Sequence, residues 1–176
     1  MHDTIQTKVQ TKDHTKTQTK AQSNTHYVTD KPMTANQVLE KAAEILACKY
    51  VNKDAFCSSE ATKDFLRFKL GNYEREVFAV MLLDSQHKLI DYQELFFGTI
   101  DATSVYPREV VKAVLQNNAA AVIFAHNHPS GANEASMADK SITQRLKEAL
   151  ALIDVSVLDH IIVGERVTSF AEQGLL

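Results

Sequence analysis

Two histidines, a serine and an aspartate are the residues of this sequence whose types and spacing are best suited to chemistry. His126 and His128 follow an apolar run, and Ser136 and Asp139 come where a helical pattern begins. Each neutral imidazole offers a nitrogen lone pair to a metal ion, and a carboxylate in the first turn of the helix could supply a third, anionic ligand. Two imidazoles and one carboxylate make an open zinc site, because the fourth tetrahedral position is left for water. One hypothesis is therefore a hydrolytic zinc site.

The same residues also have a purely structural interpretation. Ser136 and Asp139 fit the capping box, in which a serine and an acid three residues later satisfy backbone donors at the start of a helix. Pro129 and Gly131 favour a turn after the histidines, and histidines are common in surface loops. Spacing alone favours the cap for Asp139, and Ser136 could serve in both roles.

A hydrolytic zinc site also needs a general base near its water. Glu74 and Glu76 are the candidates, because both lie at the entry to the apolar run 77–83. Glu76 directly adjoins that run, so its carboxylate could lie where burial begins. Both could equally be solvated residues at the start of a strand, and spacing does not choose between them.

These residues must be positioned by the helices and strands that hydrophobic periodicity predicts. Apolar residues at helical spacing predict helices at about 34–46, 59–70, 107–117 and 136–152. Apolar runs between turn signals predict strands at 77–83, 89–100, 119–125, 155–163 and 167–170. This order predicts an α/β domain that has a mixed sheet, flanking helices and a hairpin at each end. It lacks the steady βαβ alternation of a doubly wound fold.

The first 35 residues differ in composition from the rest of the chain. They contain nine threonines and few large apolar residues, and a Thr-Lys pair recurs at every fourth position from Thr7 to Lys20. A helix would stack these lysines at repulsive i,i+4 positions, so we predict a disordered, Thr/Lys/Gln-rich tail at 1–35. A solvated leader is one interpretation, and binding of nucleic acid or a partner is the other. We expect an N-terminal helix and linker at 36–58 and the folded domain at 59–176.

Charge and composition limit the classes of partner. The chain has 176 residues and a net charge of −3, but residues 1–35 carry five lysines against three aspartates, so the remaining residues carry −5. Nonspecific nucleic-acid binding depends on clustered basic residues, and this acidic body is therefore a poor candidate for it. No apolar run reaches the roughly 18 residues that a membrane span needs.

The N-terminus and the cysteines bear on location. The chain begins without the apolar core of a secretory signal. Cys48 and Cys57 lack the paired spacing of a zinc knuckle, and two such cysteines suit a reducing compartment. We therefore expect a cytoplasmic protein with no membrane segment.

The spacing H-x-H-x7-S-x2-D, from His126 to Asp139, resembles the signature of JAMM (MPN) metalloproteases. Over roughly residues 59–176 the sequence is similar to the RadC branch of that family, in EREVFAVMLLDSQHKLI, ELFFGTI, VYPREVVKAVLQNNAAAVIFAHNHPSG, SMADKSIT, LDHIIVG and SFAEQGLL. The resemblance implies the JAMM/MPN architecture, which is like that of cytidine deaminases.

For the site, the resemblance implies Zn2+ held by His126, His128 and Asp139. Glu76 would be the general base, taking a proton from the zinc-activated water and passing it to the leaving amine. Ser136 would donate a hydrogen bond to the oxyanion. The implied reaction is hydrolysis of a peptide or isopeptide bond in an unidentified protein or peptide substrate.

The sequence departs from the RadC pattern in two places. Ala135 stands where the family often has proline before the serine, and this change leaves the ligands in place. Residues 1–58 contain no glycine-containing helix-hairpin-helix, so the chain resembles the short, catalytic-domain-only form found on prophages. A role as a DNA-repair or recombination accessory protein, which the RadC name suggests, is the alternative function. A metal-dependent nuclease would need a second cluster of ligands that the chain does not show, and a scaffold braced by the metal is a third possibility.

Asp159 and His160 form a last candidate pair, since a hydrogen-bonding partner often orients a metal-binding histidine. They lie in the apolar run 155–163 and could as well be a satisfied core pair. We therefore leave them out of the predicted site.

Overall fold

The computed structural model describes residues 32–35, 37–39, 41–42, 45, 59–98 and 104–176. The predicted tail at 1–35 and linker up to residue 58 lie almost entirely outside these residues. The described positions between residues 35 and 45 have helical backbone, in agreement with the apolar stripe there. Among the described residues, no helix combines the length and the apolar character that crossing a bilayer requires.

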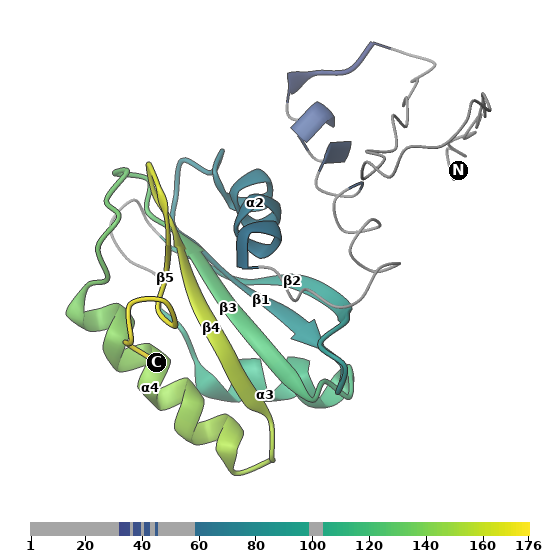
Figure 1. The fold of residues 1–176 in the computed structure, drawn as a ribbon, viewed down its shortest axis with the longest axis vertical. Coiled ribbons are helices and arrows are strands. Elements are labelled where there is room, and N and C mark those ends of the chain that lie inside the picture. The colour runs from purple at the N-terminus through teal and green to yellow at the C-terminus, as the bar shows by residue number, and fades with distance from the viewer. Residues whose placement is uncertain (1–31, 36, 40, 43–44, 46–58, 99–103) are drawn as a thin grey trace, which may run out of the picture. The chain divides into compact units, whose positions relative to one another are not determined.

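A five-stranded mixed sheet forms the centre of the folded domain (Figure 1). Its strands are β1 (Val77–Leu83), β2 (Leu89–Phe97), β3 (Ala121–Asn127), β4 (Ser156–Val163) and β5 (Val167–Ser169). Their order across the sheet is β2-β1-β3-β4-β5. The pair β3–β4 is parallel and the other neighbours are antiparallel, so the predicted mixed sheet with a hairpin at each end is confirmed.

Three helices cover the two faces of this sheet: α2 (Ser59–Leu70), α3 (Pro107–Gln116) and α4 (Met137–Ala151) (Figure 1). Strand residues alternate between the faces. On β1 the residues Ala79 and Met81 pack with α2, whereas Phe78 and Val80 pack in the cluster that includes residues of α3 and α4. The site described below lies on the α3 and α4 side.

The strand that carries the first histidine is displaced from its predicted position. We expected a strand at 119–125, but β3 begins at Ala121 and continues through Asn127. His126 pairs with Phe78 of β1 and Asn127 pairs with Val163 of β4, so neighbours on both sides extend the strand. His126 therefore lies within the sheet, and only His128 lies in the turn that Pro129 and Gly131 predicted.

The second strand is shorter than the predicted run 89–100. It ends at Phe97, and Gly98 instead donates its backbone N–H to the carbonyl of Glu76, at 2.8 Å. Residues 99–100 lie outside the described part. The limits of β4 and β5 differ from the predicted ones by a single residue, at Val155 and at Phe170.

Candidate metal centre

The two histidines meet at the end of β3. His126 is almost completely buried, and its Nε2 atom lies 3.0 Å from Nε2 of His128. Nδ1 of His128 lies 3.0 Å from the carbonyl oxygen of Ala132. A carbonyl oxygen can only accept, so this Nδ1 carries a proton and Nε2 is the atom that His128 offers to a metal. Both rings therefore present Nε2 to the same point.

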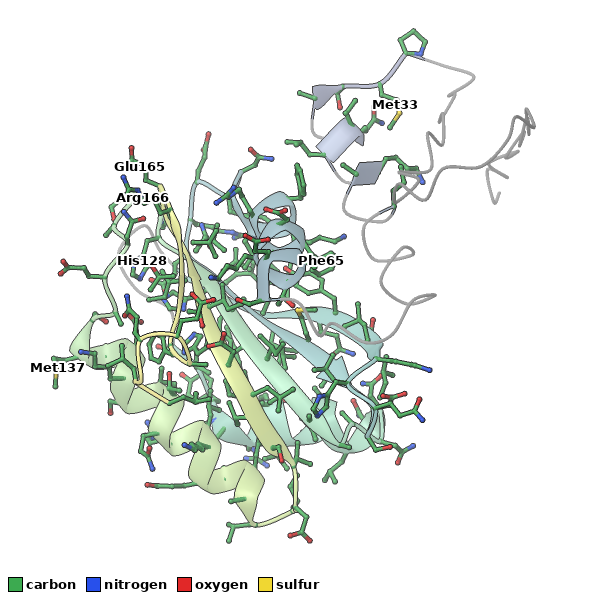
Figure 2. The ribbon with its side chains drawn as sticks, in the orientation of Figure 1. Met33, Phe65, His128, Met137, Glu165 and Arg166 are labelled. Carbon is green, nitrogen blue, oxygen red and sulfur yellow. The ribbon has the colours of Figure 1, made fainter. Side chains whose placement is uncertain are left out.

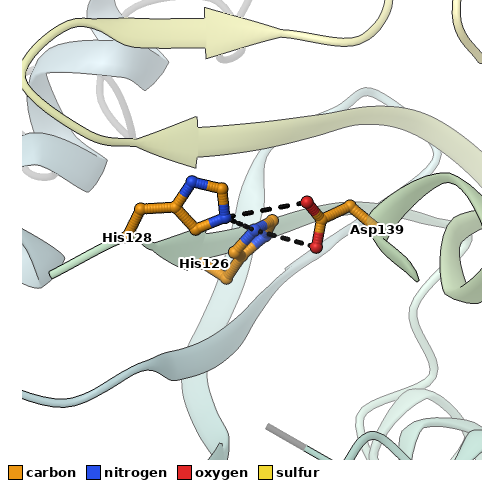
Figure 3. Close-up of side chains that lie close together, drawn as sticks. All are labelled: His126, His128 and Asp139. Carbon is orange, nitrogen blue, oxygen red and sulfur yellow. Dashed lines mark hydrogen bonds and ion pairs between the residues drawn. The ribbon is translucent and has the colours of Figure 1, made fainter. Parts of the chain in front are cut away.

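Asp139, in the first turn of α4, completes this group (Figure 3). Its Oδ1 atom lies 3.3 Å from Nε2 of His126 and its Oδ2 atom lies 3.6 Å from Nε2 of His128. The candidate ligand atoms of the three residues all lie within 4.8 Å of one another. Two imidazole nitrogens and one carboxylate oxygen are a donor set that zinc accepts, so the residues present fit a metal ion.

The Asp139 carboxylate is both the predicted metal ligand and part of the predicted capping box. Oγ of Ser136 accepts from the backbone N–H of Asp139 at 3.1 Å, while Oδ2 of Asp139 accepts from the backbone N–H and from the hydroxyl of Ser136, at 2.8 and 2.7 Å. The cap thereby fixes the carboxylate with Oδ1 toward His126. Burial raises the pKa of Asp139, but the adjacent imidazoles of His126 and His128 and the hydrogen bond from Ser136 outweigh burial and hold that pKa well below its usual range.

The loop that follows His128 is held by the turn between β4 and β5 (Figure 2). The backbone N–H of Glu165 donates to the carbonyl of Gly131, and that of Arg166 donates to Oδ1 of Asn133. The carbonyl of Ala132, which orients His128, lies against Gly164, where an added Cβ would come within 2.2 Å of that oxygen. The position of the His128 ring therefore depends on a glycine at 164.

The structure separates the two glutamates that spacing could not. Glu76 is half-buried and lines a cavity of about 680 Å³, and His126, His128 and Asp139 line it too. Glu74 is exposed and is not among the residues that line this cavity. The reason is the antiparallel pairing of β1 and β3, which brings the start of β1 beside the end of β3.

Asn127 fastens the segment before β1 to the end of β3. Its Oδ1 atom accepts from the backbone N–H of Val77 at 2.8 Å, and its Nδ2 donates to the carbonyls of Tyr73 and Arg75, at 3.2 and 3.0 Å. Asn127 is buried. It therefore positions the backbone on both sides of Glu76, a role that sequence patterns gave no reason to expect.

His160, which we left out of the predicted site, lies directly behind His126. Its Nε2 atom is 2.9 Å from Nδ1 of His126, and its Nδ1 atom is 2.5 Å from the hydroxyl oxygen of Thr143. Burial lowers the pKa of His160 well below its usual value, so the ring is neutral.

Asp159 points elsewhere. Its carboxylate accepts from the hydroxyl of Ser169 and from the backbone N–H of Ala171, and so it organises the turn that follows β5. The adjacent pair is therefore divided: His160 supports the candidate metal centre, and Asp159 supports the C-terminal segment.

A mixed sheet with flanking helices, two histidines at the end of one strand and an aspartate in the first turn of the next helix is consistent with the JAB class of domains. The chain belongs to this class, in the family of RadC-like JAB domains, whose model matches residues 56–175. The match covers the folded domain and confirms the predicted family.

Three relatives of this chain bear names that state no activity. It is 61% identical over 152 residues to a UPF0758 protein of Vibrio cholerae serotype O1, covering 86% of this chain and 97% of that protein. A second UPF0758 protein of the same strain is 57% identical over 150 residues, which are 85% of this chain and 95% of that protein. A longer UPF0758 protein of Leptothrix cholodnii is 57% identical over 140 residues, and these are only 63% of its length.

Proposed function

We propose that this protein is a zinc-dependent hydrolase of JAMM type that cleaves a peptide or isopeptide bond. The observation that supports this proposal is the presence of Glu76 on the wall of the same cavity as His126, His128 and Asp139. A metal that only braced the fold would need the three ligands but would not need a half-buried glutamate lining the cavity beside them.

Zinc is the proposed metal because two imidazoles and one carboxylate leave a fourth tetrahedral position open. When bound, zinc would act as a Lewis acid and lower the pKa of a water molecule to about 7. His126, His128 and Asp139 would hold it.

The remaining chemistry belongs to the chain's own residues. The Glu76 carboxylate would accept a proton from the attacking water and donate it to the leaving amine. The Ser136 hydroxyl would stabilise the negative oxygen that forms on the carbonyl carbon, by a hydrogen bond of a kind worth about 3 kcal/mol. That hydroxyl now donates to Oδ2 of Asp139, so it must turn from this partner toward the substrate. Its role as an oxyanion donor stays a prediction.

The cavity indicates what kind of segment could enter it. Val105, Tyr106 and Ile142 supply apolar wall, while Glu134 and Arg145 supply charge of both signs. We propose that a protein or peptide segment is bound here, in the cytoplasm. We do not extend the proposal to DNA, because the residues beyond 35 carry a net negative charge.

A pair of glutamate variants tests the proposal. Glu76→Gln should lower peptidase activity, measured on a library of quenched fluorescent peptides, by two orders of magnitude or more, in line with the roughly 10²–10⁴-fold effect of general bases. Glu74→Gln is the matched control, since it changes the same charge two residues away and outside the cavity, and it should retain activity. Equal activity of the Glu76→Gln variant and the unmodified protein would overturn the proposal.

A further inference from the structure

Three hydrogen-bonding contacts connect two of the candidate ligands through the interior of the protein. The Thr143 hydroxyl donates to the backbone carbonyl of Asp139, at 2.5 Å. The same hydroxyl oxygen lies 2.5 Å from Nδ1 of His160, and Nε2 of His160 lies 2.9 Å from Nδ1 of His126. We infer that Thr143 and His160 are positioning residues that fix the tautomer of His126, keeping its proton on Nδ1 and its Nε2 lone pair toward the metal. This inference rests on the metal-binding part of the proposed function.

The direction of each hydrogen bond follows from the one before it. The Thr143 hydroxyl donates its single proton to the carbonyl of Asp139, which can only accept. The hydroxyl oxygen must then accept from His160, which places the His160 proton on Nδ1. A neutral imidazole has one N–H, so Nε2 of His160 is an acceptor and can pair only with an N–H on Nδ1 of His126. The lone pair of His126 is left on Nε2.

The surroundings of His160 disfavour a competing arrangement in which this ring is charged. A doubly protonated His160 could donate from both nitrogens, and His126 would then carry its proton on Nε2. His160 is completely buried, and the rings of Phe78, Phe124 and Phe170 lie around it with centroids at 5.6, 6.0 and 4.8 Å. An isolated charge in such a position is strongly disfavoured.

The geometry also couples the ligands to each other. Thr143 is one helical turn after Asp139 on α4, and His160 is on β4, which pairs with β3. The contacts thus begin at the backbone of Asp139 and end at the ring of His126. Because the helix, the two strands and the two side chains are fixed together, the binding atoms are oriented before any metal arrives.

The tautomer can be measured directly in metal-free protein. Nitrogen-15 labelling of the histidines and two-dimensional NMR of the imidazole nitrogens distinguish the two neutral forms. The unmodified protein should show His126 protonated on Nδ1 and His160 protonated on Nδ1. A proton on Nε2 of His126 would overturn the inference without the need for any variant.

Substitutions at Thr143 test the consequence for metal binding. Thr143→Val keeps the shape of the side chain but removes the hydroxyl, and zinc affinity measured by competition with a chromophoric chelator should fall roughly 10- to 100-fold, as partners of metal ligands usually show. Thr143→Ser restores the hydroxyl and should restore most of that affinity. Thr62→Val is the matched control, because Thr62 is also a buried helical threonine but lies on α2, across the sheet.

Failure of this inference and failure of the proposed function give different results. If Thr143→Val binds zinc as tightly as the unmodified protein and the His126 tautomer is unchanged, the hydrogen bonds from Thr143 through His160 to His126 have no role in metal binding. If the tautomer and the zinc affinity behave as expected but no peptide is cleaved and Glu76→Gln has no effect, the inference about Thr143 and His160 is supported and the hydrolase proposal fails.

Discussion

Nδ1 of His126 lies 2.9 Å from Nε2 of His160, and both rings are buried beneath the candidate metal centre. The two residues are 34 positions apart in the chain, on neighbouring parallel strands. The nitrogen of His126 that faces Asp139 is therefore backed by a second, neutral histidine. A metal-binding histidine commonly has such a partner on its other nitrogen, although a carboxylate or a carbonyl is the usual choice.

Asn127 should be required for activity although it touches no ligand atom in the described contacts. Asn127→Asp keeps the acceptor for the N–H of Val77 but replaces two donated hydrogen bonds with a buried charge facing the carbonyls of Tyr73 and Arg75. We expect the free energy of unfolding to fall by about 1–3 kcal/mol or more. Turnover should also fall, because Glu76 loses its fixed backbone, while zinc content stays near that of the unmodified protein. Urea denaturation, peptidase assays and elemental analysis measure the three quantities. Full activity in a folded Asn127→Asp variant would show that Glu76 is positioned by other contacts.

Gly164→Ala should weaken zinc binding through a displaced carbonyl. The new methyl group would meet the Ala132 oxygen at 2.2 Å, so the oxygen must move, and His128 loses its partner at Nδ1. We expect zinc affinity to fall roughly 10-fold or more, as for the loss of other partners of ligand histidines. Gly174→Ala is the control for destabilisation without a displaced carbonyl, because the φ of +66° at Gly174 strains an alanine there but the added Cβ meets no atom within 4 Å. Chelator competition that gave both variants the same affinity would rule out this role for Gly164.

Ser136→Gly should separate capping from catalysis. Glycine is tolerated at an N-cap with a loss of only a few tenths of a kcal/mol, so thermal stability should change little. The hydroxyl that is proposed to reach the oxyanion is removed, and turnover should fall by a factor of about 10²–10³. Parallel measurement of the melting temperature and kcat checks this expectation. A loss of stability with unchanged kcat would instead restrict Ser136 to the helix cap.

Hydrophobic periodicity predicted most of the helices and strands, because the buried residues of each one recur at helical or at strand spacing. The strand at 77–83 was predicted at the limits that the structure gives, and the helix predicted at about 59–70 spans Ser59–Leu70. The strand at 119–125 was predicted two residues too early, since His126 and Asn127 read as loop residues when taken alone. Their strand conformation comes from β1 and β4, which are distant in the sequence.

The candidate site shows the same division between local and long-range information. Residue spacing identified four of the candidates, His126, His128, Ser136 and Asp139, because they belong to one strand–loop–helix unit. Spacing could not choose between Glu76 and Glu74, because that choice depends on the antiparallel register of β1 against β3. His160 was left out of the predicted site for the same reason. Only the parallel pairing of β3 with β4 brings it behind His126.

His126, His128 and Asp139 are proposed to hold a catalytic zinc ion, and the zinc content of the purified protein tests this proposal most directly. Elemental analysis after dialysis against metal-free buffer should find about one zinc per chain in the unmodified protein. It should find almost none in His128→Ala, whose side chain is partly exposed and whose removal spares the core. A folded unmodified protein that binds no zinc when the ion is supplied, or zinc content that is unchanged in His128→Ala and His126→Ala, would contradict the account.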